Sequence, residues 1–273
     1  MFRPGTNTAT LSFANRFVEE RLRPGAEPKR DTLQSWIKNG VPRDQLIQEI
    51  CLQILAGSDT TATSIRMTVL FLLTSPPVLR KFLAEMDEGI ASGKISSPIT
   101  NSEAQALPYL QAIIHESLRM YPPGINLGYK QVPPAGDTLH GYYLPPGTQV
   151  GQNLWGMQRS KEVFGEDADV FRPERWLEAD KAQYTVMKDT VGIVFGYGKY
   201  GCLGKVMAMM ELNKIYVEVS SCTCLGRNKR SLTQHQLFRR FEFAITNPVK
   251  PLSLRNATLW LTSNFWLKVT RRE

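Results

Sequence analysis

The sequence predicts a mainly α-helical fold with a small antiparallel β component. Apolar residues recur at helical spacing through residues 1–120, whereas glycine, proline and short apolar pairs follow through residues 124–150. The first pattern is typical of amphipathic helices and the second of short strands joined by turns. The 273 residues, 42% hydrophobic and 21% charged, have the composition of a globular protein, which excludes collagen, coiled-coil and disordered chains.

The predicted elements follow from this periodicity and from the prolines and glycines that interrupt it. Five helices are expected in the first part of the chain: residues 13–22, a short helix around Trp36, residues 44–73, residues 78–90 and residues 102–120. Residues 165–201 are expected to be rich in loops and to precede a helix from Cys202 to about Val217. The alternation of residues 259–269 predicts β structure near the end of the sequence.

Charge and cysteine content narrow the class of protein. The formal net charge of +8 permits anionic partners without requiring them, and no nucleic-acid partner is expected. Four cysteines are too few for a disulfide scaffold and favour a reducing compartment. The longest apolar run, residues 69–73, is far shorter than the ~18–20 residues of a membrane-spanning helix. We also find no signal-peptide pattern after Met1.

The segment from Phe195 to Gly204 carries the strongest chemical signal. It reads Phe-Gly-Tyr-Gly-Lys-Tyr-Gly-Cys-Leu-Gly, so three glycines precede Cys202 at the expected start of a helix. Unsatisfied N–H groups and the positive helix end favour a thiolate there, and glycines let the backbone approach a large flat group. The pattern indicates an axial thiolate for haem iron. The alternative is a buried cysteine behind a glycine-rich turn.

This segment resembles the haem-binding loop of the cytochrome P450 family, Phe-x-x-Gly-x-Arg-x-Cys-x-Gly. Phe195, Gly198, Cys202 and Gly204 match it. The resemblance implies haem b as cofactor, with Cys202 as the axial ligand of its iron. The arginine of the family, which helps to hold a haem propionate, is replaced by tyrosine at position 200. Lys199 is the candidate to take over that contact.

A second match involves Glu116 and Arg119, which are three residues apart on one predicted helix. Alone, such a pair is usually a surface ion pair of little energetic value. Here it is followed by Tyr-Pro-Pro at residues 121–123 and by Phe-Arg-Pro-Glu-Arg-Trp at residues 171–176, as in the cytochrome P450 family. The resemblance implies a structural triad of Glu116, Arg119 and Arg175 that locks the loop behind the haem.

A third match is Ala-Gly-Ser-Asp-Thr-Thr at residues 56–61, inside the long predicted helix. Glycine and hydroxyl residues weaken a helix, so we expect a local bulge that opens a groove for dioxygen. Asp59 and Thr60 would pass protons there and are the predicted catalytic residues. The alternative is a polar stretch of helix that faces solvent.

By this resemblance the protein is a monooxygenase that inserts one oxygen atom from dioxygen into a small lipophilic substrate. It is most similar to fungal secondary-metabolism members, which take electrons from an NADPH-dependent cytochrome P450 reductase at the endoplasmic reticulum membrane. Substrate contacts are expected from residues 54–60, 124–129 and 259–262. The alternatives are an inactive, haem-free truncated remnant or misannotated fragment of such an enzyme, a haem enzyme for rearrangement or dehydration, and a basic nucleic-acid or structural module.

The resemblance covers the C-terminal half of the family's domain. We therefore expect residues 1–273 to form a single truncated domain, with membrane association only in a full-length form. Residues 219–236 lack apolar periodicity and are suspected to be a translated intron, since Val219-Ser220 can be encoded by a splice-donor sequence and Gln236 by an acceptor end. A metal site at Cys222, Cys224 and His235 is disfavoured by its spacing.

Overall fold

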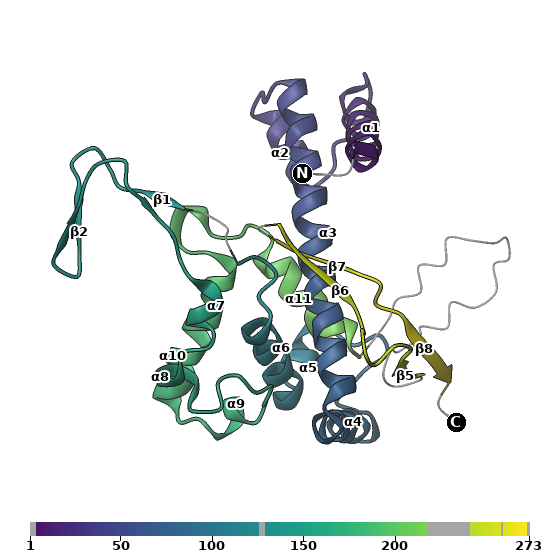
Figure 1. Cartoon of the computed structure of the whole chain (residues 1–273). Helices are drawn as coiled ribbons and strands as arrows, with labels where there is room; N and C mark the ends of the chain where they lie inside the picture. Colours follow the sequence, from purple (N-terminus) through teal and green to yellow (C-terminus); the bar gives the residue numbers. More distant parts are fainter. Residues whose placement is uncertain (1–3, 126–128, 218–240, 258, 272–273) are drawn as a thin grey trace, which may run out of the picture. The chain divides into compact units, whose positions relative to one another are not determined.

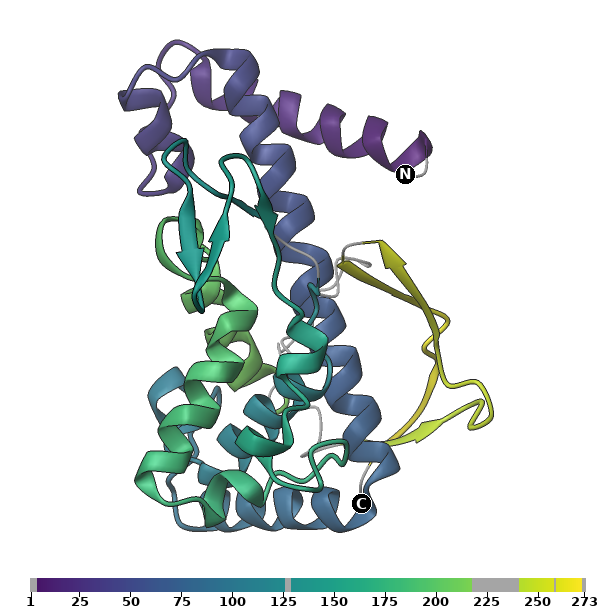
Figure 2. The same cartoon turned by 60° about the vertical axis from the view of Figure 1, so that its left-hand side comes forward.

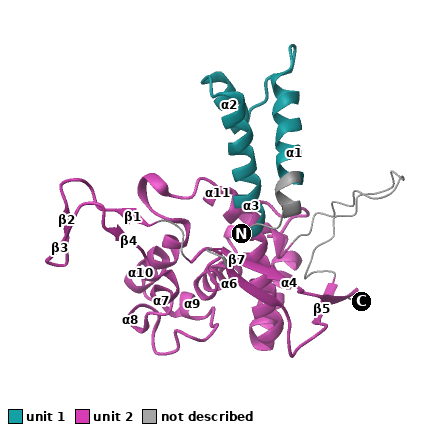
Figure 3. Cartoon of the chain, turned by 45° about the horizontal axis from the view of Figure 1, so that its top comes forward, with its two compact units in different colours: residues 1–59 teal, residues 60–273 magenta. Residues whose placement is uncertain are grey.

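The computed structural model describes residues 4–125, 129–217, 241–257 and 259–271 (Figure 1). The chain divides into two compact units, unit 1 with residues 1–59 and unit 2 with residues 60–273 (Figure 3). The long helix α3 (Arg43–Thr74) contributes its first half to unit 1 and its second half to unit 2. The suspected insertion at residues 219–236 lies outside the described residues.

Unit 1 consists of α1 (Pro4–Leu22), α2 (Thr32–Lys38) and the first half of α3. Its core is a single apolar cluster formed by Ala14, Val18, Leu33, Leu46, Ile47 and Ile50. Asp31 begins α2 by accepting a hydrogen bond from the backbone of Gln34 at 2.9 Å. The side chain of Arg21 donates to the same carboxylate at 2.6 Å, and this bond lowers the pKa of Asp31.

The second half of α3 is followed by α4 (Pro76–Ala91), whose axis turns by 107° (Figure 2). The single helix expected over residues 102–120 is wrong, because the structure has two helices there, α5 (Asn101–Gln105) and α6 (Pro108–Met120). Pro108 has no N–H to continue α5 and is instead the first residue of α6, a position that proline favours.

Helix α6 runs through the core of unit 2, where ten of its thirteen residues are buried. It packs against α4, α5, α9 (Arg175–Glu178), α10 (Lys181–Gly192) and α11 (Lys205–Ile215). The polar residues Glu116 and Arg119 are among its buried positions. Charged groups in the core are tolerated only if they are paired. Because α6 is buried on almost all sides, Glu116 and Arg119 must therefore find their partners inside unit 2.

The expectation of loops over residues 165–201 is only partly correct. Helix α10 begins where Asp180 accepts a hydrogen bond from the backbone of Gln183 at 2.8 Å. Its inner face buries Met187 and Val191, four residues apart. The other elements are short: α7 (Leu154–Met157), α8 (Lys161–Phe164), and the 3₁₀ turns η1 (Ile193–Phe195) and η2 (Gly198–Tyr200).

Among the described residues the strands form four antiparallel pairs, which together with the helices confirm the predicted fold class. The pairs are β1 (Lys130–Gln131) with β4 (Gln149–Val150), β2 (Asp137–Leu139) with β3 (Tyr142–Leu144), β5 (Phe241–Ile245) with β8 (Leu267–Arg271), and β6 (Ser253–Ala257) with β7 (Leu259–Ser263). The alternation at residues 259–269 therefore belongs to two strands, β7 and β8, separated by a turn at which Asn264 adopts a positive φ.

In the described part of the chain, each helix taken singly fails the length and apolarity expected of a membrane span. Helices α3 and α4 meet that length and composition only when they are taken together as a bent pair.

Candidate functional site

Cys202 lies in a tight glycine turn between α10 and α11. The backbone N–H of Cys202 donates to the carbonyl of Phe195 at 2.7 Å, which closes the turn. Gly196 has a φ of +72°, and a Cβ atom there would lie 2.9 Å from the carbonyl oxygen of Tyr200. Gly198 also has a positive φ, of +64°. The path of the backbone therefore requires glycine at both positions.

The thiol of Cys202 is exposed. The expectation that a helix opens at Cys202 is wrong by three residues, since α11 begins at Lys205 with Gly204 as its N-cap. The carbonyl of Cys202 accepts from the backbone of Lys205 at 3.3 Å, so the residues in between form a turn. The cysteine still precedes the unsatisfied N–H groups of the first turn of α11.

The surroundings of Cys202 fit the expected haem. A Cβ atom at Gly204 would come no nearer than 3.8 Å to the sulfur, and glycine directly precedes Cys202 at position 201. Leu203 and Val206 are 98% and 83% exposed, with Met207 also exposed. Exposed apolar side chains that follow an exposed thiol along the chain are typical of a binding surface, and thiolate is an established ligand of haem iron.

Two lysines lie against the aromatic ring of Tyr200, the residue that replaces the arginine of the family. The Nζ atom of Lys130, from β1, is 4.1 Å from the ring centroid, and that of Lys199 is 5.7 Å away. Of these two lysines, the sequence motif predicts Lys199 but not Lys130. No sequence signal marks Lys130, because only the folding of β1 next to η2 brings it to the loop. Phe195 is half-buried, with Nζ of Lys205 5.5 Å from its ring.

Asp59 and Thr60 are adjacent residues of α3. Asp59 is exposed and belongs to unit 1, whereas Thr60 is half-buried and belongs to unit 2. The expected bulge is not formed, since every residue from Arg43 to Thr74 is α-helical. Nearby hydroxyls bond back to the helix without breaking it, as where the Oγ atom of Ser64 donates to the carbonyl of Thr60 at 3.2 Å.

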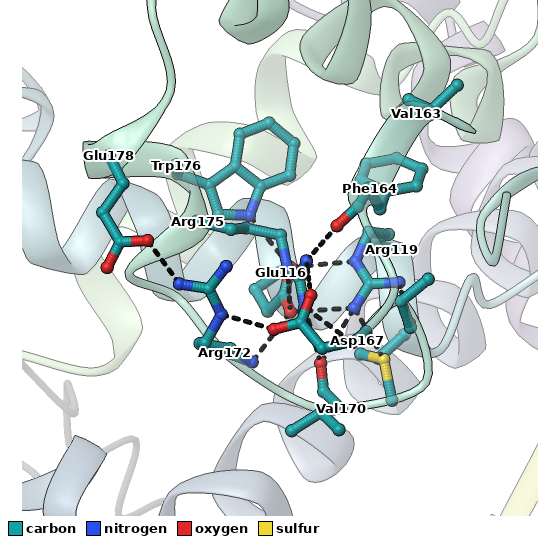
Figure 4. Close-up of polar contacts among 12 residues, drawn as sticks. Glu116, Arg119, Val163, Phe164, Asp167, Val170, Arg172, Arg175, Trp176 and Glu178 are labelled. Carbon is teal, nitrogen blue, oxygen red and sulfur yellow. Dashed lines mark hydrogen bonds and ion pairs between the residues drawn. The ribbon is translucent and has the colours of Figure 1, made fainter. Parts of the chain in front are cut away.

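Glu116 is the centre of a buried polar cluster in unit 2 (Figure 4). Its carboxylate accepts hydrogen bonds from the side chains of Arg119 at 2.8 and 2.9 Å, Arg175 at 3.0 Å and Trp176 at 2.9 Å. It also accepts from the backbone N–H of Arg172 at 2.8 Å. The structure thus brings together the three residues predicted as a triad, and its five donors meet the requirement that a buried carboxylate be paired.

The two arginines of this cluster also hold the chain that precedes Arg175. Their remaining N–H groups donate to backbone carbonyls: those of Gln158 (2.7 Å), Ala168 (2.6 Å) and Val170 (3.1 Å) from Arg119, and those of Phe164, Asp167 (2.9 Å) and Val170 (3.1 Å) from Arg175. An irregular segment can be fixed in this way because each planar guanidinium presents five donors.

Asp167 and Trp176 complete the cluster and were not predicted. Asp167 accepts from Arg175 at 2.8 Å and from Arg172 at 2.6 Å. Burial acts to raise the pKa of Asp167, but these two hydrogen bonds outweigh it and lower the pKa. Trp176 belongs to the Phe-Arg-Pro-Glu-Arg-Trp motif, so its sequence position was a usable signal, whereas Asp167 lies in a loop without one.

Two of the three segments expected to contact substrate lie side by side in unit 2. Gly124 and Leu259 form an isolated antiparallel bridge, and the backbone N–H of Trp260 donates to the carbonyl of Pro123 at 3.0 Å. Helix α3 joins them through Thr63, whose hydroxyl donates to the carbonyl of Trp260 at 3.0 Å. Residues 126–128 of the first segment lie outside the described residues.

Comparison with known proteins gives the same family as these motifs. The profile of the family named Cytochrome P450 matches residues 8–219. The cytochrome P450 monooxygenase ABA1 of Pyricularia oryzae is 40% identical over 256 residues, which are 93% of this chain and 46% of that protein. The monooxygenase aba1 of Botryotinia fuckeliana is 37% identical over 265 residues, 97% of this chain and 48% of that protein.

A third relative, the cytochrome P450 monooxygenase abl1 of Leptosphaeria maculans, is 37% identical over 248 residues, 91% of this chain and 41% of that protein. The chain belongs to the cytochrome P450 family. Membership implies a thiolate-ligated haem as the cofactor. The chain spans about half the length of these curated relatives.

Proposed function

We propose that this chain is part of a haem-thiolate monooxygenase that inserts one oxygen atom from dioxygen into a small lipophilic substrate of fungal secondary metabolism. The observation that carries the proposal is the exposed Cys202 in its glycine turn, followed along the chain by exposed apolar side chains. The relatives that resemble the chain, named cytochrome P450 monooxygenases and found in fungi, support this class of reaction.

Cys202 would hold haem b through its sulfur, and the bound haem would supply the activation of dioxygen. Gly204 leaves room beside the sulfur, Gly198 allows the positive φ of the turn, and the carbonyl of Phe195 fixes the turn by accepting the N–H of Cys202. Lys199 would contact a propionate. The chain therefore contributes the ligand, the cradle and one counter-charge of the cofactor.

Asp59 and Thr60 would handle protons. The carboxylate of Asp59 is exposed and can exchange protons with solvent. The hydroxyl of Thr60, the next residue of α3, is half-buried and would pass a proton from Asp59 to the reacting oxygen. A relay of this kind distinguishes oxygen insertion from rearrangement or dehydration, which need no proton delivery to dioxygen. The proposed role of Glu116, Arg119 and Arg175 is structural. They would hold the irregular chain that precedes Arg175 in the sequence and that leads on to the Cys202 turn.

The whole protein would draw electrons from an NADPH-dependent cytochrome P450 reductase at the endoplasmic reticulum membrane. We further propose that residues 1–273 form part of a single domain of this family, with residues 219–236 as a translated intron. The match to the family profile ends at residue 219, where the suspected insertion begins, which is in line with this proposal.

The experiment that tests the function is turnover with isotopically labelled dioxygen. The protein, reconstituted with haem and a fungal reductase, is given NADPH and the lipophilic probes lauric acid and limonene. We expect products that carry one labelled oxygen atom, loss of product in Cys202→Ser, and in Thr60→Ala a larger share of NADPH diverted to hydrogen peroxide. A wild-type protein that binds no haem would support the alternative, an inactive haem-free remnant.

A further inference from the structure

The backbone of Trp260 is a junction of three segments of unit 2. Its N–H donates to the carbonyl of Pro123 and its carbonyl accepts from the hydroxyl of Thr63, both at 3.0 Å. Both backbone polar groups of this residue are therefore paired, one with the segment after α6 and one with α3. The end of the hairpin at which β6 passes into β7 lies beside α3 in Figures 1 and 2.

The donor in this junction is buried. Thr63 is 1% exposed, so while the hairpin covers it the hydroxyl has to find its hydrogen-bond partner within the protein, and the carbonyl of Trp260 is that partner. One turn further along α3, Arg66 donates to the hydroxyl of Thr262 at 2.7 Å. Two side chains of one helix face thus hold alternate residues of β7, which fixes both the distance and the register of the strand against the helix.

The same junction is packed by aromatic rings. The ring of Trp260 is 5.1 Å from that of Tyr121 and 6.1 Å from that of Trp155, between centroids. The guanidinium of Arg159 covers Trp155 at 3.5 Å. Packing alone allows a strand to slide by fractions of an ångström, whereas the hydrogen bond from Thr63 has a defined length and direction.

Thr63 lies three residues after Thr60, within one helical turn. We infer that Thr63 is a positioning residue for substrate selection, because its hydroxyl sets where Trp260 and the hairpin tip at Leu259 stand relative to Thr60. This inference rests on the proposed function, which places the reacting atoms near Thr60. Thr63 itself is buried under the hairpin and acts through Trp260.

The chain offers matched variants for a test. Thr63→Val keeps the shape of the side chain and removes the donor, and Thr63→Ser restores it. Thr68→Val is the control, since Thr68 is equally buried on α3 but its hydroxyl donates at 2.8 Å to the carbonyl of Ser64, within its own helix. Thermal unfolding of all three variants establishes that each is folded.

The first readout is amide hydrogen exchange of residues 259–263, which needs no cofactor. We expect Thr63→Val to speed the exchange of the Trp260 amide roughly threefold to tenfold, as for the loss of one hydrogen bond, and Thr63→Ser and Thr68→Val to leave it near wild type. Unchanged exchange in Thr63→Val would overturn the inference.

The second readout is the dissociation constant of two azoles for the haem-loaded protein. Under the proposed function, imidazole is small enough to bind without touching the hairpin, whereas the much larger clotrimazole would reach it. We expect Thr63→Val to weaken clotrimazole by roughly threefold to tenfold and to leave imidazole unchanged. Equal effects on both azoles would overturn the role in selection. A wild type without haem would overturn the proposed function and the role in selection with it, while exchange still decides whether Thr63 anchors Trp260.

Discussion

The Nε atom of Arg175 donates to the Oε1 atom of Glu116 at 3.0 Å, which joins two buried residues that are 59 positions apart in the sequence. Glu116 belongs to the central helix α6, and Arg175 begins the short helix α9. This contact ties the core of unit 2 to the irregular chain that leads to the Cys202 turn. The stability of that chain therefore depends on a carboxylate that no water reaches.

Glu116→Gln should destabilise unit 2 strongly. The amide offers one acceptor oxygen where the carboxylate serves five donors, and it removes the charged partner of the buried Arg119 and one of the two charged partners of Arg175. Breaking a buried pair costs about 3–5 kcal/mol. Urea unfolding measures this loss. The control is Glu166→Gln, whose carboxylate pairs with Lys161 at 2.8 Å but is 88% exposed, and which should cost less than about 1 kcal/mol. Equal losses in the two variants would contradict the role of Glu116.

The glycine turn can be tested by a graded series of alanines. Gly192→Ala adds a Cβ atom in helical backbone with nothing within 4 Å and should be neutral or stabilising by up to about 1 kcal/mol. Gly198→Ala meets no neighbour but has a φ of +64°, which costs about 1–2 kcal/mol. Gly196→Ala combines a positive φ with a contact of 2.9 Å to the carbonyl of Tyr200 and should cost more. Thermal unfolding ranks the three, and any other order would argue against this backbone path.

His115 should make the protein less stable in weak acid. Burial lowers its pKa, partly opposed by its contact with the carbonyl of Gln111, at 2.7 Å from Nδ1. The histidine of the unfolded chain has a pKa of about 6.5, so near that pH it binds a proton more tightly than His115 does in the folded state. As pH falls below about 6.5, the free energy of unfolding should decrease by at most about 1.4 kcal/mol per pH unit from this group.

The effect of His115 is isolated by difference. Glu85 has a pKa raised by burial, so its contribution is present at low pH and is lost as pH rises above the ordinary glutamate value, the opposite sign. We compare the free energies of unfolding of wild type and His115→Phe between pH 7 and about 5. The contribution of Glu85 is the same in both proteins and cancels in their difference. His140→Asn is the control, because His140 is exposed. A His115→Phe variant with the pH profile of wild type would rule out this histidine as the source.

The suspected insertion makes a prediction about the transcript. If residues 219–236 are a translated intron, complementary DNA from the mature message should lack their codons, and genomic DNA should begin that stretch with GT at Val219. Sequencing of both nucleic acids is the measurement. A mature message that keeps these codons would show that the protein carries them.

The sequence was informative where chemistry repeats locally. The period of the apolar residues located α3, and the spacing of Glu116 and Arg119 marked a pair that the structure buries. The apolar pattern did not reveal the break at Pro108, because it continues from one helix into the next. It did not reveal α10 either, because the inner face of that helix buries only Met187 and Val191. Helical periodicity alone carries no information on such breaks.

Contacts between distant segments could not be predicted either. Lys130 reaches Tyr200 only because β1 folds back towards the turn, and Thr63 reaches Trp260 across 197 positions. Nothing in the residues near Lys130 or Thr63 distinguishes them from other lysines and threonines. The expected bulge at residues 56–61 was wrong for a different reason, since the helix tolerates glycine and hydroxyl groups while its backbone hydrogen bonds persist.

The measurement that tests the account most directly is the absorption spectrum of the reduced, carbon monoxide-bound haem complex. We predict that wild type gives the red-shifted Soret band of thiolate-ligated haem, that Cys202→Ser loses it, and that Cys51→Ser, which changes the half-buried cysteine of unit 1, keeps it. The same band in wild type and Cys202→Ser, or its loss in Cys51→Ser alone, would contradict the assignment of Cys202 as the ligand.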